Sequence, residues 1–283
     1  MAENPVRRPG PTRRVRVVEF SAVRDGVGGE RRREDRVVTE EPLEIRLGWP
    51  GRAAERLWVT MRTPGHDFEL AAGWLLHEGV ITGADDVQRV AYCTDTALAP
   101  DQEFNVVTVT LTGSPSGALP HQHIALSAGS SACGVCGRDS LDGVLATRRA
   151  PAWTDALPPP DVVRSLPDAL RGHQQVFSRT GGAHAAGLVD ASGSLLVVRE
   201  DVGRHNAVDK VTGSRLLAGE AVAQACLVVS GRAGFELVQK AVVAGIGSLV
   251  AVGAPTGLAV ELASRSGLAL YGFARENRVV RYA

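Results

Sequence analysis

A regular alternation of short β-favouring runs with longer helical segments, between residues 185 and 273, limits the fold of this chain more than any other feature. Strands are expected at 185–189, 195–199, 226–229, 249–252 and 268–273, and helices at 205–217, 235–244 and 257–265. Strands that alternate with helices of these lengths are typical of α/β domains, in which helices cover a largely parallel sheet. The sequence therefore predicts a layered α/β domain over residues 161–283.

The first half of the chain has a different pattern, which predicts a smaller α+β subdomain. Short alternating apolar stretches between residues 43 and 63 predict strands. A helical repeat follows from Phe68 to Gly79, with Asp67 as the expected N-cap. Two further strands are expected at 87–92 and 104–111.

Four prolines between residues 150 and 161 separate these two halves, because proline continues neither a helix interior nor a central strand. We therefore expect an N-terminal α+β subdomain over residues 37–150 and a C-terminal domain over residues 161–283. The C-terminal domain should begin with a helix at 161–175 that is broken near Pro167.

Residues 1–36 differ from the rest of the chain in charge, with ten arginines and six acidic residues. Only residues 15–20 have a strand-like pattern, so we expect a flexible arginine-rich arm. Over the whole chain 31 basic residues balance 31 acidic residues. This balance argues against a nucleic-acid partner and against binding to an acidic membrane surface.

The apolar segments of the sequence indicate where in the cell the protein is expected, because they resemble neither a membrane span nor a signal peptide. The uncharged run from 241 to 260 is interrupted by glycines and by Pro255, so it is a poor membrane span. The arginines near the N-terminus are not followed by an apolar segment of the kind that secretory signal peptides contain. The sequence predicts a cytoplasmic protein with no membrane contact.

Two of the four cysteines, Cys133 and Cys136, form a Cys-x-x-Cys pair flanked by small residues. This spacing can favour the thiolate, which is the nucleophile in sulfur exchange. Three chemistries fit the pair: sulfur transfer, dithiol redox chemistry, and zinc binding together with His121 and His123. The remaining interpretation is that the two cysteines have no function. The Cys-x-x-Cys spacing alone leaves all four interpretations open.

Three glycine-containing loops follow expected strands in the C-terminal half, at 199–206, 230–234 and 253–257. Ligands of open α/β sheets bind beyond the carboxyl ends of strands, where loop N–H groups and helix N-termini favour anions. The three loops together predict a phosphate-binding cradle that Arg204 or Arg232 would complete.

Charged residues around His205 are a weaker candidate for acid–base chemistry. They are Glu200, Asp201, Asp209 and Lys210, and charges at a helix start are more often caps and ion pairs.

The segment 273–278 offers groups that suit a nucleotide at the end of the last expected strand. An aromatic ring stacks on a base, and guanidinium groups bind phosphates. The residues are Phe273, Ala274, Arg275, Glu276, Asn277 and Arg278.

Several motifs in combination resemble the FdhD family of formate dehydrogenase accessory sulfurtransferases. The resemblance runs from about residue 37 to the end and leaves the arginine-rich arm outside it. The motifs are Thr63-Pro64-Gly65-His66-Asp67-Phe68-Glu69-Leu70 with Gly73 and Glu78-Gly79, Cys133-Gly134-Val135-Cys136, Thr180-Gly181-Gly182-Ala183-His184, Glu200-Asp201-Val202-Gly203-Arg204-His205-Asn206-Ala207-Val208-Asp209-Lys210, Ser230-Gly231-Arg232 and Gly272-Phe273-Ala274-Arg275.

The resemblance implies a sulfurtransferase that works through a cysteine persulfide. A cysteine desulfurase would hand sulfur to Cys133, with Cys136 assisting by relay or exchange. The sulfur would pass to the molybdenum of a bis(molybdopterin guanine dinucleotide) cofactor that formate dehydrogenase requires. Residues 273–278 match the stretch that binds this cofactor in the family.

The resemblance also implies a homodimer whose C-terminal domain has a cytidine deaminase-like fold. Deaminase chemistry is not implied, because the His-x-Glu motif of a deaminase zinc site is absent and Ala132 precedes Cys133 where that site has proline.

Two alternatives from other functional classes are kept. One is a non-catalytic cofactor chaperone stabilised by zinc, with His121, His123, Cys133 and Cys136 as ligands. The other is a dithiol oxidoreductase that cycles a Cys133–Cys136 disulfide. The roles of His66, His205 and Arg232 are not assigned by the sequence.

Overall fold

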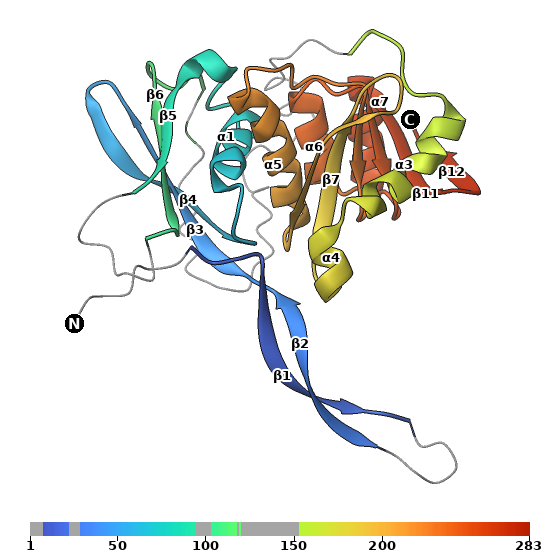
Figure 1. Cartoon of the computed structure of the whole chain (residues 1–283). Coiled ribbons are helices and arrows are strands. Elements are labelled where there is room, and N and C mark those ends of the chain that lie inside the picture. The colour runs from blue at the N-terminus through green and yellow to red at the C-terminus, as the bar shows by residue number, and fades with distance from the viewer. Residues whose placement is uncertain (1–7, 23–28, 94–102, 118, 120–152) are drawn as a thin grey trace, which may run out of the picture.

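The computed structural model describes residues 8–22, 29–93, 103–117, 119 and 153–283. These residues form a two-stranded, a four-stranded and a six-stranded sheet. The four-stranded and six-stranded sheets lie on either side of two packed helices (Figure 1). This arrangement confirms a mixed α/β protein.

The six-stranded sheet belongs to the C-terminal half and has the strand order β12-β11-β10-β9-β7-β8. Its strands lie close to the positions that the alternating pattern predicts, with β12 as an addition. Their bounds are β7 (His184–Val189), β8 (Leu195–Asp201), β9 (Cys226–Val229), β10 (Ser248–Ala251), β11 (Ala269–Arg275) and β12 (Arg278–Arg281).

The expectation of a largely parallel sheet is wrong, because the sheet is mixed. Strands β9, β10 and β11 are parallel neighbours, whereas β7 is antiparallel to β8 and β9, and β12 is antiparallel to β11. The cause is the length of the connections. A tight turn closed by a 3.1 Å hydrogen bond from Gly193 N to Asp190 O joins β7 to β8, and so short a connection links only antiparallel strands.

Helices cover both faces of this sheet, and the alternation of side chains along each strand explains why. In β9, Leu227 and Val229 belong to the core under α5 (Arg204–Leu217), α6 (Phe235–Val243) and α7 (Gly257–Ser266). Cys226 and Val228 point the other way, into the core under α3 (Pro160–Gly172). Adjacent residues of a strand face opposite sides, so a central strand buried on both faces is apolar throughout.

Helix α3 differs from its prediction, because it continues through Pro167 without a break. Val163, Leu166 and Leu170 lie on its buried side at helical spacing, and this packing holds the helix together although Pro167 lacks a backbone donor. Helix α4 (Gln175–Thr180) follows as a separate short helix. Among the described residues no helix combines the length and apolar character needed to cross a membrane.

The four-stranded sheet has the order β4-β3-β6-β5 and packs on helix α1 (Asp67–His77). Its strands are β3 (Glu41–Trp49), β4 (Arg52–Arg62), β5 (Val87–Tyr92) and β6 (Val106–Leu111), with a short 3₁₀ turn at Ala84–Asp86 before β5. Leu43, Ile45 and Leu47 alternate toward α1, as the period of two predicts. These elements confirm the expected strands and helix of the first half.

Helices α1 and α5 join the two sheets through a direct backbone contact. A Cβ atom on Gly73 would overlap the carbonyl oxygen of Asp209, and one on Gly213 would overlap the carbonyl oxygen of Glu69. Glycine at these positions therefore lets the two helices approach more closely than any other residue would permit.

Residues before β3 form a long two-stranded ribbon of β1 (Thr12–Phe20) and β2 (Glu30–Val38), which projects away from both sheets (Figure 1). The sequence indicated strand character at 15–20 alone. The second strand had no apolar alternation to reveal it, because its first seven residues, 30–36, are all charged. Its base contacts α4, where Val38 lies against Gly182.

We expect Gly213→Ala to destabilise the protein, because the added methyl group forces α1 and α5 apart. Overpacking of this kind costs about 1–3 kcal/mol, which urea unfolding followed by circular dichroism would resolve. The control is Gly172→Ala in the last turn of α3, where nothing lies within 4 Å of the added Cβ. Equal stability of Gly213→Ala and the control would contradict the close packing.

Candidate functional site

An open pocket of about 660 Å³ lies at one edge of the six-stranded sheet. Four segments far apart in sequence line it: the stretch 167–184 with parts of α3 and α4 and the start of β7, the end of β9, the end of β10, and the β11–β12 hairpin. The lining residues are Pro167, Asp168, Arg171, Gln174, Phe177, Gly181, Gly182, Ala183, His184, Ser230, Val252, Ala274, Arg275, Glu276 and Asn277.

The mixed sheet explains why these segments meet. β7 runs antiparallel to β9, so its first residue, His184, lies at the same edge as the carboxyl ends of β9, β10 and β11. Ser230 holds this corner, because its hydroxyl accepts a 2.9 Å hydrogen bond from the N–H of Ala185. The carboxyl edge is where open α/β sheets bind ligands.

The segment 273–278 comprises the end of β11, as the sequence predicts, the two-residue turn that follows it and the first residue of β12. Residues 274–277 line the pocket, whereas Phe273 and Arg278 do not. Phe273 has a positive φ of 52° at an irregularity in the β11–β12 pairing. The guanidinium of Arg278 lies 5.5 Å from the centroid of the Phe273 ring. Arg275, Glu276 and Asn277 are all exposed and all line the pocket.

The opposite wall of the pocket is formed by α3, α4 and the link between them, and the sequence analysis did not identify it. Arg171 lies over the Phe177 ring, 4.0 Å from its centroid. Gln174 is buried, with 4% of its surface exposed, and its Nε2 has no hydrogen-bond partner among the described residues. A buried amide without a partner is rare because it has lost its water, so this donor suits an oxygen of a ligand in the pocket. Gln174 lies in no recognisable motif, and only the fold reveals it.

His184 contributes a neutral imidazole to the pocket. Burial lowers the pKa of this histidine, and the nearby charges of Arg204 and His205 lower it further. A neutral imidazole has one donor and one acceptor, so His184 suits a polar, uncharged part of a ligand.

The three glycine-containing loops lie at this edge, and several of their backbone donors bind within the protein, so the phosphate cradle stays a prediction for the other N–H groups of these loops. Val202 N binds Thr63 Oγ1 at 3.0 Å, Gly253 N binds Gly231 O at 3.0 Å, and Thr256 N binds Ala233 O at 3.1 Å. Donors that the protein itself uses are not free for phosphate. His205 is paired as well, because its Nε2 lies 2.6 Å from Glu236 Oε2, and this contact lowers the pKa of Glu236.

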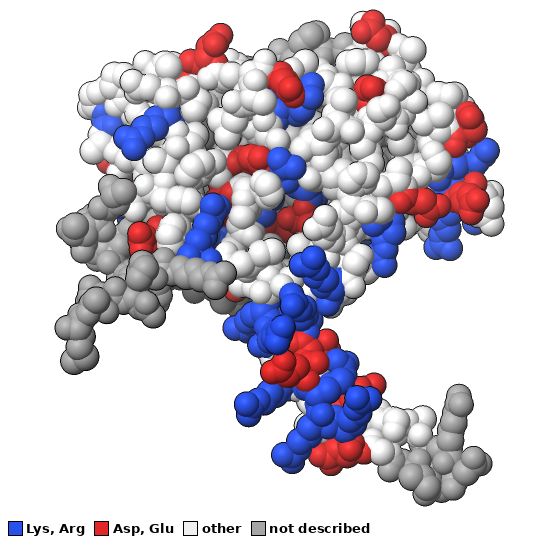
Figure 2. Space-filling model, in the orientation of Figure 1, with Lys and Arg blue, Asp and Glu red and all other residues white. Residues whose placement is uncertain are grey.

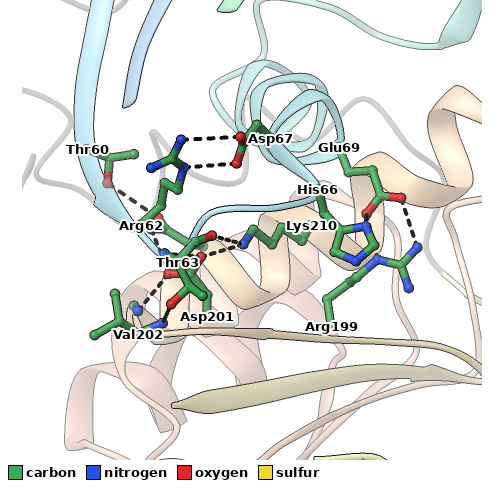
Figure 3. A network of polar contacts seen from close by, with 12 residues as sticks. Thr60, Arg62, Thr63, His66, Asp67, Glu69, Arg199, Asp201, Val202 and Lys210 are labelled. Carbon is green, nitrogen blue, oxygen red and sulfur yellow. Dashed lines mark hydrogen bonds and ion pairs between the residues drawn. The ribbon is translucent and has the colours of Figure 1, made fainter. Parts of the chain in front are cut away.

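The motifs at residues 63–70 and 200–210 come together in a buried polar network, which Figure 3 shows. Lys210 Nζ lies 2.6 Å from Asp201 Oδ2 and donates to Thr63 O at 2.9 Å. Thr63 N donates in turn to Asp201 Oδ2 at 3.1 Å. Lys210 and Asp201 are fully buried, so each charge depends on the other. These residues hold the two halves of the chain together.

Asp67 also acts differently from its prediction as an N-cap. His66 occupies the cap position with a positive φ of 58°, and its side chain makes no capping hydrogen bond. The Asp67 carboxylate instead binds Arg62 through two contacts of 2.9 and 3.3 Å and accepts a 2.7 Å bond from the Tyr92 hydroxyl. The side chain of Arg62 is fully buried, so Asp67 neutralises a charge inside the N-terminal half.

Glu69 forms a third contact between the halves, through two hydrogen bonds of 2.6 and 2.8 Å from Arg199 (Figure 3). Its other neighbour is His66, 3.2 Å away. Burial by itself would raise the pKa of Glu69, but the hydrogen bonds from Arg199 and His66 outweigh this and lower the pKa to about 2.

Asp209 links three helices. Its Oδ1 lies 2.6 Å from His77 Nδ1 on α1 and 2.6 Å from Lys240 Nζ on α6. Burial by itself would raise the pKa of Asp209, but the charge of Lys240 and the hydrogen bond from His77 lower it. Burial also lowers the pKa of His77, which keeps this imidazole neutral.

The predicted sulfur site, Cys133 and Cys136, and the histidines of the zinc alternative, His121 and His123, lie outside the described residues. Of the other thiols, Cys226 is fully buried in β9, and burial raises its pKa to about 12. In the part of the chain that the structure describes, no three His, Cys, Asp or Glu side chains are grouped to hold a metal ion.

Comparison with known proteins places this chain in a family. A model of the FdhD/NarQ family matches residues 38–283. A sulfur carrier protein FdhD of Streptomyces avermitilis is 48% identical over 92% of this chain and 91% of its own length. One of Streptomyces coelicolor is 46% identical with the same shares of both chains.

A solved structure has the same overall fold. A protein of Desulfotalea psychrophila, described as a formate dehydrogenase accessory protein, superposes with a TM-score of 0.68 over 95% of this chain and 96% of its own. At 24% identity this likeness supports the fold alone.

We expect Glu69→Gln to lower the free energy of unfolding at pH 7 by about 1–3 kcal/mol, because Arg199 loses a charged partner. Folding depresses the pKa of Glu69 from 4.5 to about 2, so this contribution is complete above pH 4.5 and is lost as pH falls toward 2. The gap between wild type and variant should therefore narrow over this range in urea titrations.

The control is Glu55→Gln, which removes an exposed ion pair with Arg52 and should cost less than about 0.5 kcal/mol at any pH. A Glu69→Gln effect of constant size from pH 7 to pH 3 would rule out the ion pair as its cause.

Proposed function

The chain belongs to the FdhD/NarQ family, and from this membership we propose that it is a sulfur carrier that serves formate dehydrogenase. It accepts persulfide sulfur from a cysteine desulfurase and transfers it to the molybdenum of a bis(molybdopterin guanine dinucleotide) cofactor. This makes the protein a sulfurtransferase with the cofactor as bound cargo. The step takes place in the cytoplasm and ends with delivery of the cofactor to formate dehydrogenase.

The sulfur step needs a thiolate that can reach two large partners in turn. The Cys133 thiolate attacks the terminal sulfur of the donor persulfide, the sulfur–sulfur bond of the donor breaks, and the donor leaves as a thiolate. In a relay, the Cys136 thiolate attacks the same terminal sulfur and releases Cys133. The residues that flank both cysteines in the sequence are small, and small neighbours suit such exchange because its rate depends on access to the sulfur atom that is attacked.

The observation that carries the cofactor half of the proposal is the pocket at the sheet edge. Residues 274–277, which the family resemblance assigns to cofactor binding, line it together with Gln174 and His184. A guanine nucleotide needs cations for its phosphates and amide or carboxylate groups for its base. Arg171 and Arg275 supply the first, and Asp168, Gln174 and Asn277 supply the second.

The topology supports two further parts of the proposal. The order β8-β7-β9-β10-β11, with β7 antiparallel, suits the cytidine deaminase-like fold that the resemblance implies for the C-terminal domain. We also propose that the domains divide near the proline-rich segment. Residues 153–159 contain no helix or strand there, but Trp153 and Leu157 pack on Gly247 of the C-terminal half.

We expect Cys133 to carry the persulfide. After incubation with a cysteine desulfurase and free cysteine, peptide masses of the wild type should show one added sulfur atom, and Cys133→Ala should show none. Cys136→Ala should still gain the sulfur but deliver it more slowly.

Each other outcome points to a different function. Sulfur on Cys133→Ala would remove this residue from the transfer, and a Cys133–Cys136 disulfide without persulfide would favour the oxidoreductase. Bound zinc without persulfide would favour the cofactor chaperone.

We expect Arg275→Ala to weaken guanosine diphosphate binding about 10–100-fold in titration calorimetry, because a charge-assisted hydrogen bond is lost. Arg278→Ala should also weaken it, because Arg278 belongs to the same matched stretch, although it does not line the pocket. Persulfide formation should be unchanged in both variants.

Gln174→Leu separates ligand binding from folding. It should weaken nucleotide binding while leaving the unfolding free energy unchanged or higher, because the buried amide has no partner to lose. Arg52→Ala, on the β3–β4 hairpin, is the matched control for charge. Nucleotide affinity equal to the wild type in Arg275→Ala and Gln174→Leu would refute this pocket as the nucleotide site.

A further inference from the structure

The β1–β2 ribbon extends from the body of the molecule, and Figure 2 shows positive and negative side chains mixed along it. In β2 the residues from Glu30 to Arg36 read Glu, Arg, Arg, Arg, Glu, Asp, Arg. Among the described residues no further strand pairs with either edge of the ribbon. A free edge offers unpaired N–H and C=O groups to another chain.

The backbone bonds of the ribbon identify which groups are free. Ser21 N bonds to Gly29 O and Thr39 N to Pro11 O, each at 3.0 Å, and both bonds join directly opposite residues. Bonded pairs recur at every second position of an antiparallel ladder. Residues 31, 33 and 35 therefore bond to β1, and residues 30, 32, 34 and 36 present their backbone groups outward.

Two side-chain bonds support this assignment. The outward carbonyl oxygen of Glu34 accepts a 3.4 Å hydrogen bond from the guanidinium of Arg33. The outward N–H of Arg36 bonds to the carboxylate of its own neighbour Asp35 at 2.8 Å, as expected for a group without a strand partner.

The charges of this edge have opposite sign at equal distances from Arg33. Arg32 and Glu34 lie one residue away on either side, Arg31 and Asp35 two residues away, and Glu30 and Arg36 three residues away. Such a strand is complementary to an antiparallel copy of itself. We propose that the free edge of β2 binds the same edge of a second copy of this chain, with a two-fold axis at Arg33, to form a four-stranded sheet in the order β1-β2-β2-β1.

The hydrogen-bond pattern permits this register. Glu30 lies opposite Arg36 of the second copy, and Arg32 lies opposite Glu34 of the second copy. All four residues present outward backbone groups, so each of these pairs can exchange both of its backbone bonds. An interface of this kind is isologous, which is the commonest way for identical chains to associate.

The other face of the new sheet is compatible as well. Arg31 lies opposite Asp35 of the second copy, and Arg33 meets its own symmetry mate at the axis. Each Arg33 already binds Glu19 at 2.8 Å and Asp35 at 3.2 Å in its own ribbon. The repulsion between the two Arg33 guanidinium groups at the axis is therefore offset in each copy by Glu19 and Asp35.

Other registers are disfavoured by charge. A shift of two residues in one direction sets Glu30 against Glu34 and Arg31 against Arg33. A shift in the other direction sets Arg32 against Arg36 and Glu34 against its own mate. Like charges directly opposite each other destabilise a sheet, so the charges select one register.

A nucleic acid is a poorer occupant of this edge, because Glu30, Glu34 and Asp35 would meet phosphates. A second copy would also stabilise the ribbon itself, because a two-stranded sheet in water is marginally stable and gains stability from further strands. The inference does not depend on the proposed function, and the family match at residues 38–283 leaves nearly all of the ribbon outside it.

The test is a charge exchange in the full chain, followed by sedimentation equilibrium at about 0.05 M salt, where surface charges act over a long range. Arg32→Glu and Glu34→Arg should each weaken association roughly tenfold or more, because two contacts per interface become repulsive. An equimolar mixture of the two variants should associate again, since every contact between positions 32 and 34 is then attractive. The wild-type association should weaken at about 0.5 M salt.

The matched control is Arg13→Glu, which makes the same change of charge on β1, away from the proposed edge, and should leave association unchanged. Where the chain also dimerises through another surface, the same variants shift the step from dimer to tetramer. Association that neither variant changes, or a mixture no stronger than its parts, would overturn the proposal.

A cross-link tests the register itself. The axis brings the two Arg33 Cα atoms to about 4.5 Å, which is within disulfide range. Arg33→Cys should therefore form a 33–33 disulfide under mild oxidation, identified by peptide mass. Arg31→Cys should not form one with itself, because it lies opposite Asp35. Equal cross-linking of both variants would contradict the register.

Discussion

The contact between α1 and α5 is the constraint on which the rest of this structure depends. Gly73 and Gly213 let the two backbones touch, and the ion pair of Asp201 with Lys210 and its bonds to Thr63 lie beside that contact. Breaking a buried pair of this kind costs about 3–5 kcal/mol because one charge stays uncompensated. The two halves that the composition separates are therefore held as one body, and Asp201 stands directly before the loop that leads to His205.

The order of the C-terminal strands and helices follows from the sequence, because short β-favouring runs such as β9 and β10, which are buried on both faces, alternate with longer helical segments. The direction of β7 does not follow from periodicity. It depends on the short turn to β8, and this antiparallel strand brings His184 to the pocket edge. Helix α3 was divided in error at Pro167, because the packing of Val163, Leu166 and Leu170 outweighs one missing donor.

The residues of the candidate site that belong to a sequence motif could be predicted, whereas those that only the fold brings to the pocket could not. The stretch 273–278 carried recognisable nucleotide chemistry, and residues 274–277 line the pocket. Gln174 lies in the link between α3 and α4 and Phe177 in α4, and neither belongs to a motif, so their place in the wall depends on how these two helices pack at the sheet edge. The charged residues around His205 were considered for acid–base chemistry. Asp201, Asp209 and Lys210 are buried, and each is in an ion pair or hydrogen bond within the protein.

The burial of Cys226 bears on the selectivity of a protein that handles reactive sulfur. With a pKa of about 12, this thiol is ionised in only about one molecule in 10⁵ at neutral pH. Its fully buried position in β9 also keeps any donor persulfide from approaching. The core can thus retain a cysteine for packing without offering a competing acceptor. Discrimination among thiols of identical chemistry is then a matter of ionisation and access, both decided by the sheet.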